Sequence, residues 1–442
     1  MRRNHILALS ILTFALVLPF LLASRASEDL LAVWIAAQSF YGERLDLVYP
    51  VTDPVFTMQP PSKEWIVMAT ELEHDGQIFP YLYPPIWAAL IAPLTAFLDF
   101  DTVERIFNLL NPLLLVACSW LAWRALRSPM PALQFIFIGQ ILYYGTTIGG
   151  IAVLQNQPQI IVAFLTLLTI ERSRADAQIA AGAALALAAA IKLYPVLYAP
   201  ILLARGQTRA FLAFLSIGCA LGLTSIVLAG WPLHVVFLDA VAGVANTVMR
   251  VPAAYGLDTV LAWLLPKDGM NYVTATSLDP DAHAGWYVMS RPLVWSLAIR
   301  TTLLACLALS FLRALAISEG ALYESLWPAT IIALALLSPL AWCYYFIAPL
   351  AFAPSLLSTY GRHTGTALLL VIALLVSIPL LQFNQKLLFL DGDMISFFGF
   401  VSMLLLLAAF GLSHRWTHPK SGTRNKNTGA HRRLRSIPSD DR

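Results

Sequence analysis

Residues 179–195 read IAAGAALALAAAIKLYP, and this stretch decides the class of fold. Thirteen uncharged residues, 179–191, precede Lys192. Within them Gly182, Ala186 and Ala190 recur every four residues, a small-residue stripe typical of a helix packed tightly inside a membrane bundle. The stretch therefore predicts a membrane helix with a single positive charge at its end.

The composition of the whole chain supports a membrane protein. Of 442 residues, 59% are hydrophobic and 12% are charged, whereas a soluble chain has roughly 25% charged residues. Runs of apolar residues predict an all-α polytopic protein with about 11 to 13 transmembrane helices, at roughly 20 residues each. We expect one transmembrane domain over residues 1–412, starting with an uncleaved anchor at 5–23, and a basic, disordered cytoplasmic tail at 413–442.

Charge and cysteine usage exclude several classes of protein. The 28 Lys and Arg nearly balance the 25 Asp and Glu, so no basic face remains for nucleic acid. The four cysteines stand singly in apolar runs, without the spacing of a disulfide framework or a zinc site. Neither GxGxxG nor GxxxxGK[ST] is found. We therefore expect no metal and no cofactor. Because no nucleotide-binding motif is present, we expect the activated substrate to be a lipid-linked molecule dissolved in the bilayer.

The distribution of arginine predicts the orientation of the chain, because cytoplasmic loops carry the positive excess. Arg124, Arg172 and Arg205 fall at alternate ends of successive spans, which marks that side as cytoplasmic. With the N-terminus inside, three crossings before Arg124 would place it outside. Either the segment 84–98 re-enters the membrane or the rule fails there.

Two long segments, 25–80 and 231–291, are expected on the external side. In the first, Leu30, Val33, Trp34 and Ala37 recur at helical spacing and predict a helix lying in the membrane interface, ended by Gly42. The second mixes tryptophans with polar turns and also resembles an interfacial segment.

Glu28 and Asp29 stand at the start of the first external segment. A carboxylate there could act as a general base toward a hydroxyl nucleophile. Alternatively, Ser27 caps the helix and the two acids only complement its positive N-terminal end. The residues alone leave both interpretations open.

Lys192 is the second candidate, because a lysine toward a helix centre costs roughly 2.5 to 3.5 kcal/mol on insertion scales. A phosphate at contact distance would supply about 4 kcal/mol at an effective dielectric near 20, whereas a lysine that snorkels to the interface needs no partner. Arg250 and Arg291 are weaker candidates for holding a phosphate.

Aromatic and polar residues near the external ends of spans form a third group. Such aromatics usually belong to the interfacial belt, but a sugar also prefers an aromatic pocket with a few polar anchors. The candidates for substrate binding are Tyr83, Gln157, Tyr194, Trp342 and Tyr344.

Four blocks of this sequence, in order, resemble glycosyltransferase family 87. They are DLLAVWIAAQSFYGERLDLVY from Asp29 to Tyr49, YPPIWAALIAP from Tyr83 to Pro93, AGAALALAAAIKLYP from Ala181 to Pro195, and SPLAW from Ser338 to Trp342. The resemblance implies a GT-C-like fold and a polyprenyl-phosphate-sugar donor. It also implies that Asp29 is the catalytic carboxylate, with Glu28 as the substitute, and that Lys192 lies near the lipid phosphate. Where relatives often have a histidine after the late tryptophan, this chain has Cys343, Tyr344 and Tyr345.

The function expected on this basis is inverting transfer of a sugar to a hydroxyl of a lipid or glycan acceptor. The resemblance favours a hexose such as mannose, handled at the external face of the plasma (inner) membrane. The partners are then the lipid-linked donor, the acceptor and membrane lipids. The chief alternative is a secondary transporter of a small polar solute, and a third is a lipid-binding scaffold without catalysis.

Overall fold

The computed structural model describes residues 6–11, 13, 27–50, 55–279, 284–378 and 393–417. The expected anchor at 5–23 and the expected tail at 413–442 lie largely outside the described residues. Helix α20 continues to Thr417, whereas the tail was expected to begin at residue 413.

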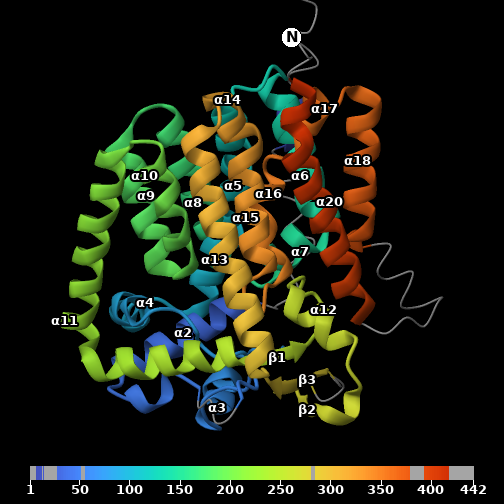
Figure 1. Ribbon diagram of the computed structural model, residues 1–442. Coiled ribbons are helices and arrows are strands. Elements are labelled where there is room, and N and C mark those ends of the chain that lie inside the picture. Colours follow the sequence, from blue (N-terminus) through green and yellow to red (C-terminus); the bar gives the residue numbers. More distant parts are fainter. Residues whose placement is uncertain are drawn as a thin grey trace, which may run out of the picture.

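The fold is all-α and polytopic, as predicted, and its helices stand side by side in one bundle (Figure 1). Among the described residues, four helices are long and apolar enough to cross a membrane. They are α5 (Phe100–Leu126), α11 (Thr208–Asn246), α13 (Leu293–Ala316) and α20 (Asp393–Thr417). Shorter helices fill the bundle: α6 (Ala132–Gly145), α7 (Thr147–Leu154), α8 (Gln159–Arg174), α9 (Gln178–Ile191), α10 (Ala199–Ala204), α15 (Trp327–Leu336) and α18 (Arg362–Leu375).

Several expected spans are broken into pieces shorter than 20 residues. The segment 342–357 divides into η6 (Cys343–Phe346), α16 (Ile347–Leu350), η7 (Ala353–Ser355) and the start of α17 (Leu356–Thr359). Pro349 and Pro354 remove backbone donors here, which interrupts a continuous helix. Further short pieces are η3 (Tyr194–Tyr198), α14 (Glu319–Ala321) and the π-helical turn η5 (Leu322–Leu326).

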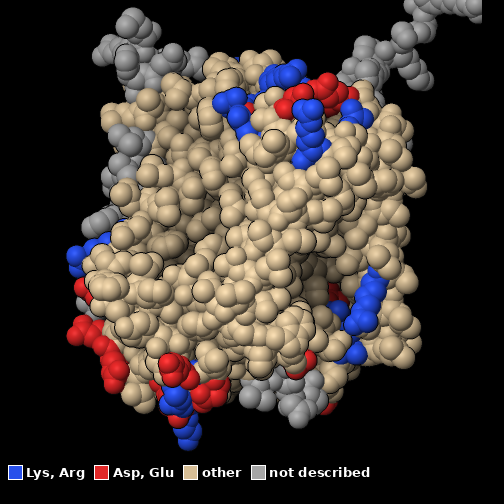
Figure 2. Space-filling view, turned by 90° about the vertical axis from the view of Figure 1, so that its left-hand side faces the viewer, with Lys and Arg blue, Asp and Glu red and all other residues tan. Residues whose placement is uncertain are grey.

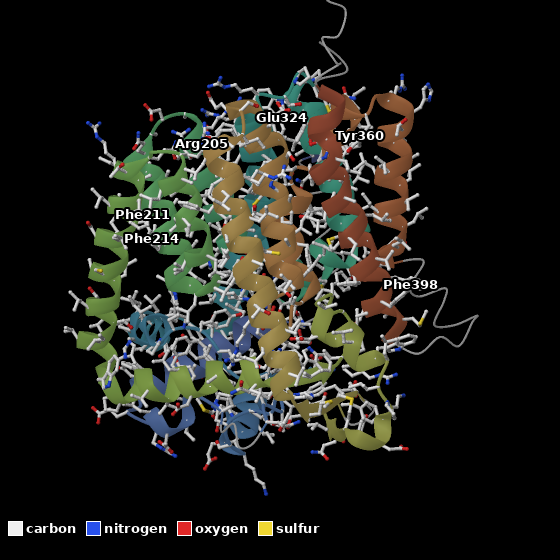
Figure 3. The ribbon with its side chains drawn as sticks, viewed as in Figure 1. Arg205, Phe211, Phe214, Glu324, Tyr360 and Phe398 are labelled. Atoms are coloured by element: carbon white, nitrogen blue, oxygen red, sulfur yellow. The ribbon has the colours of Figure 1, made fainter. Side chains whose placement is uncertain are left out.

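Charged side chains gather toward the two ends of the molecule and leave an uncharged band between them (Figure 2). At the end named here the arginine end, Arg124 Nε lies 2.8 Å from Glu171 Oε1, and Arg205 donates to the carbonyl oxygen of Ala314 at 3.1 Å. Arg205 and Glu324 lie near this upper end in Figure 3. These arginines lie together at one end of the bundle, whereas Arg44, Arg250 and Arg291 lie in or next to elements of the opposite end.

The segment 84–98 does not cross the bundle. It forms α4 (Pro85–Ile91) and η2 (Ala92–Ala96), two short turns at the end opposite the arginines (Figure 1). Helix α5 then rises from that end and finishes beside Arg124. Elements this short are compatible with a segment that re-enters the membrane. The order of crossings stays a prediction, because the expected anchor at 5–23 lies largely outside the described residues.

The opposite end, named here the site end, is built from short elements of both long segments. The first segment contributes α2 (Glu28–Tyr41), η1 (Leu45–Leu47) and α3 (Glu64–Glu71). The second contributes α12 (Leu257–Trp263), η4 (Lys267–Gly269) and a three-stranded antiparallel sheet in the order β1 (Thr247–Arg250), β3 (Gly285–Ser290), β2 (Asn271–Thr274). The sequence did not predict this sheet, because its strands are only four to six residues long.

Helix α11 turns a corner to reach the site end. Gly230 has φ 75° and ψ 152°, a conformation that a glycine adopts without steric cost, and Pro232 follows it. Below this point the helix runs across the end of the bundle (Figure 1). The placement of residues 231–246 fits an interfacial helix.

Helix α2 corrects one prediction. It ends at Gly42 as expected, but residues 30–37 are buried on every face of the helix rather than along one stripe. Elements α3, α4, η1, η2 and α5 pack around it. The apolar residues from Leu30 to Ala37 therefore contact protein and not the membrane interface, a distinction that the helical spacing of one segment does not reveal.

The contact between α9 and α11 tests the packing of the bundle. A methyl group on Gly182 would overlap the carbonyl oxygen of Ala210 on α11. We expect Gly182→Ala to lower the free energy of unfolding by about 1 to 3 kcal/mol, as overpacking does. Gly218→Ala, on α11 where an added methyl group meets nothing within 4 Å, is the matched control and should be neutral or slightly stabilising. Denaturation of the purified protein in mixed micelles measures both, and equal stabilities would contradict the packing.

Candidate functional site

A cavity of about 840 Å³ opens in the site end. Its walls come from α2, η3, η6, the bent part of α11, and strands β2 and β3, and most of the lining side chains are apolar or aromatic. Among the described residues that line it, Asp29 and Lys192 are the charged ones. Two opposite charges therefore share one largely apolar chamber.

Lys192 reaches the cavity because α9 ends there. Its backbone is extended (φ −137°, ψ 137°), and Pro195 follows three residues later. Its Nζ lies 3.5 Å from Oε1 of Gln157. Three tyrosine rings surround the ammonium group, with centroids 5.4 Å away for Tyr83, 5.2 Å for Tyr344 and 4.9 Å for Tyr345. Aromatic faces attract a cation and offset part of its lost hydration.

Asp29 lies in the first turn of α2, which is not one of the apolar membrane helices. Burial raises the pKa of its carboxyl from 3.8 to about 6, while the charge of Lys192 and the amide of Gln157 oppose this rise. The two charges influence each other, but no ion pair joins them among the described residues. The cavity between them therefore has room for another group.

Gln157 lies behind the cavity wall rather than on it. Its Oε1 accepts hydrogen bonds from the Tyr83 hydroxyl at 2.8 Å and from the backbone N–H of Gln159 at 3.3 Å. Its Nε2 has no hydrogen-bond partner among the described residues, yet the amide is near enough to Asp29 to affect its pKa. Gln157 thus connects the surroundings of both charged groups without facing the chamber.

The other predicted aromatic residues do line the cavity. Tyr194 accepts a hydrogen bond from Gln159 Nε2 at 2.6 Å, and its ring lies 5.3 Å from that of Tyr345. Trp342 and Tyr344 stack with their centroids 6.1 Å apart. Tyr345, adjacent in the run SPLAWCYY, has the ring nearest to Lys192 and was not among the predicted binding residues.

Glu28 does not line the cavity. Burial is the main cause that raises the pKa of its carboxyl from 4.5 to about 7, and the charge of Asp29 adds to it. Its Oε2 is buried without a hydrogen-bond partner.

Ser27 does not cap helix α2. Its hydroxyl donates to Glu104 Oε1 at 2.5 Å and accepts from Asn156 Nδ2 at 2.9 Å. The capping interpretation is therefore wrong for Ser27, although both acids do occupy the first turn.

Arg250 and Arg291 lie away from the two charges. Neither lines the cavity. Arg291 is ion-paired with Asp258, both almost fully buried, and Asp258 also accepts from Trp295 Nε1 at 2.7 Å. Arg250 is buried in β1 opposite Tyr287. The structure thus brings Asp29 and Lys192 together, but not these arginines.

Some lining residues could not be singled out from the sequence. Gln77 and Gln155 place amides at the cavity, and Tyr272 and Trp286 bring aromatic rings from the sheet. Two of them gave a signal: Gln155 stands beside Gln157, and Trp286 is one of the tryptophans of the segment 231–291. Within the described ranges, no group of three or more His, Cys, Asp or Glu side chains is arranged to hold a metal ion.

Comparison with known proteins assigns the chain to a family. The sequence profile of glycosyltransferase family 87 matches residues 81–341, more than half of the chain. The protein therefore belongs to glycosyltransferase family 87 and is a glycosyltransferase. The match includes Tyr83, Gln157, Lys192 and Tyr194 but stops short of Asp29 and of Trp342. No curated protein sequence matches the chain.

The titration of Asp29 tests the geometry of the site without any substrate. We expect the carboxyl band of Asp29, followed by infrared difference spectroscopy, to titrate with a midpoint near 6. Because the amide of Gln157 lowers this pKa, Gln157→Leu should move the midpoint to higher pH. Gln155→Leu, which changes a lining amide that does not act on Asp29, is the matched control. Asp29→Asn and Glu28→Gln assign the bands, and identical midpoints in both leucine variants would contradict the arrangement.

Proposed function

We propose that this glycosyltransferase transfers a sugar from a polyprenyl-phosphate donor to a hydroxyl of a lipid or glycan acceptor, with inversion at the anomeric carbon. The observation that carries the proposal is that Asp29 and Lys192 line the same apolar cavity without pairing to each other. An acid and a cation held apart in this way suit a reaction that moves a proton to one side and negative charge to the other.

The apolar lining supports a lipid-linked donor. Leu197, Leu303 and Leu334 line the chamber where it borders η3, α13 and α15. A prenyl chain can lie against such side chains while its phosphate stays near Lys192. At 4 Å and an effective dielectric near 20, the ammonium and one phosphate charge attract by about 4 kcal/mol. Such a donor carries no nucleotide, so the protein does not need either of the nucleotide-binding motifs that its sequence lacks.

In the proposed reaction the acceptor hydroxyl oxygen attacks the anomeric carbon and forms the new glycosidic bond. The bond between that carbon and the phosphate oxygen breaks, and polyprenyl phosphate leaves with the electron pair. Asp29 takes the hydroxyl proton, and Lys192 stabilises the charge on the leaving phosphate. Attack from the side opposite the leaving group inverts the anomeric carbon. Phosphate leaves readily, so the protein mainly positions reactants and stabilises charge.

The resemblance of this sequence to glycosyltransferase family 87 favours a hexose such as mannose as the transferred sugar. Tyr194, Trp342 and Tyr344 line the same chamber as Lys192 and offer aromatic rings against which a sugar could pack. Tyr83 and Gln157 would hold the lysine in place from behind. The reaction would take place at the external face of the plasma membrane, because the site end lies opposite the arginine end.

A direct experiment identifies donor and acceptor together. Membranes containing the protein are incubated with radiolabelled polyprenyl-phosphate sugars, and the lipid or glycan that acquires label is identified. Label transfer from the lipid-linked sugar supports the proposal. Uptake of solute into proteoliposomes without any sugar donor would instead support a transporter, although membership of a transferase family favours the enzyme.

Replacing the proposed base should abolish transfer. We expect Asp29→Asn to bind donor but to lower kcat by about 10² to 10⁴-fold, the usual contribution of a general base. In the wild type, the rate should fall as pH decreases through about 6, because Asp29 becomes protonated. Asp46→Asn removes an acid at the surface of the same segment, with 66% of its side chain exposed, and should keep full activity. Wild-type turnover by purified Asp29→Asn would refute the base assignment.

Removing the proposed phosphate ligand should weaken donor binding. We expect Lys192→Ala to raise the donor KM by roughly tenfold or more, since a hydrogen bond to a charged group contributes about 1.5 to 3 kcal/mol. Lys63→Ala, at an exposed position in the first external segment, is the control and should leave KM unchanged. An unaltered donor KM in folded Lys192→Ala would count against the phosphate role.

A further inference from the structure

A second cavity, of about 310 Å³, lies at the arginine end, where α5 and α8 finish side by side. Its lining residues are Trp123, Arg124 and Arg127 from the end of α5, and Glu171, Arg174 and Ala175 from the end of α8. Three arginines and one glutamate therefore face a single space. This cavity is separate from the chamber that holds Asp29 and Lys192.

The glutamate is already neutralised. Its side chain is only 3% exposed, and it is paired with Arg124 at 2.8 Å and with Arg172, whose guanidinium also donates to Glu171 Oε1 at 2.7 Å. Glu171 thus has two arginine partners of its own and does not neutralise Arg127 or Arg174. Arg174 is ion-paired instead with Glu319, which does not line the cavity.

Arg174 is held rigidly but incompletely satisfied. Its side chain is 10% exposed and lies over the ring of Tyr323, 4.5 Å from the centroid. One terminal nitrogen donates to the backbone oxygen of Glu319 at 3.1 Å, whereas Nε is buried without a hydrogen bond and only 3.8 Å from the mostly exposed Glu319 carboxylate.

Arg127 adds a second cation close to Arg174. Its backbone ends α5 in a left-handed conformation (φ 49°), and among the described residues its side chain has no ion pair or hydrogen bond. The charge of Arg127 acts unfavourably on Arg174. Arg124, Arg127, Arg172 and Arg174 face the two carboxylates of Glu171 and Glu319, which leaves two positive charges. The C-terminal ends of α5 and α8 contribute partial charges of roughly −0.5 each, so about one positive charge remains in excess.

We propose that this cavity binds a phosphate group. About one unbalanced positive charge and planar guanidinium donors suit a phosphodiester or phosphate oxygen. The cavity is far larger than the about 30 Å³ that one water occupies in the liquid, so a phosphate with five heavy atoms fits. Basic pockets between membrane helices at this level are where anionic lipid headgroups bind, and a soluble phosphate would present the same oxygens.

The test uses the purified full chain in neutral detergent and three probes: phosphatidylglycerol, phosphatidylcholine and inorganic phosphate. Native mass spectrometry measures the bound lipids, and thermal unfolding at constant ionic strength measures the effect of phosphate. The main variant is Arg127→Gln, at an exposed side chain whose loss should not disturb folding. The matched control is Arg362→Gln, which removes an exposed arginine at the start of α18, at the same end of the bundle.

We expect Arg127→Gln to weaken phosphatidylglycerol binding by roughly tenfold, the value of one charge-assisted hydrogen bond, while Arg362→Gln binds like the wild type. If Arg127→Gln instead abolishes the thermal stabilisation by inorganic phosphate and leaves phosphatidylglycerol binding unchanged, the cavity binds a soluble phosphate rather than a lipid headgroup. That result also supports a phosphate site. Equal losses in both variants, or no loss in either, would overturn the proposal. Sugar transfer is not measured, so the result is independent of the proposed reaction.

Discussion

Two opposite charges in a mostly apolar chamber impose the main constraint on this structure. A charge in a low-dielectric environment is costly unless it is paired or well solvated by fixed groups. Lys192 obtains this solvation from three tyrosine rings and from Gln157. Asp29 depends on the charge of Lys192 and on the same amide. Because the two side chains do not form an ion pair, a substrate that binds between them can interact with both charges.

The architecture around the chamber follows from this requirement. Membrane proteins tolerate non-helical backbone at depth only where it is buried in protein or lines a cavity. The breaks in this bundle gather at such a place: α9 ends at Lys192, α4 begins at Pro85, and η6 follows Trp342. Long helices such as α5 and α13 run along the bundle, and the ends of the short elements lie at the cavity. The bend of α11 at Gly230 then covers it.

The extent to which sequence predicted this structure differs between local and tertiary features. An uncharged run ending in Lys192 and an apolar composition sufficed for the all-α membrane fold, because each span carries its own hydrophobic signal. The blocks YPP and KLYP identified the family, which the profile match confirms. Asp29 was selected from the first block, DLLAVWIAAQSFYGERLDLVY, and Lys192 from the third, AGAALALAAAIKLYP, and both line the cavity.

Features that depend on distant partners could not be predicted. The helical spacing of α2 resembled that of an interfacial helix, but the elements that cover its other faces come from later in the chain. Ser27 had the side chain of a cap but bonds to Glu104 and Asn156, 77 and 129 residues away. Arg291 appeared free to bind phosphate until Asp258 was found beside it. The strands were too short to show a pattern, and Gln157 seemed to face the substrate when it lies behind the wall.

If Asp29 and Lys192 act on one molecule held between them, a substrate analogue should bind in the space that separates them. A cryo-electron microscopy structure of the protein with a non-transferable polyprenyl-phosphonate sugar would show this. We expect the phosphonate oxygens within hydrogen-bonding distance of Lys192 Nζ, the prenyl chain along the apolar wall, and the anomeric carbon on the side toward Asp29. Density for the headgroup outside this cavity, or with its phosphonate away from Lys192, would contradict this arrangement.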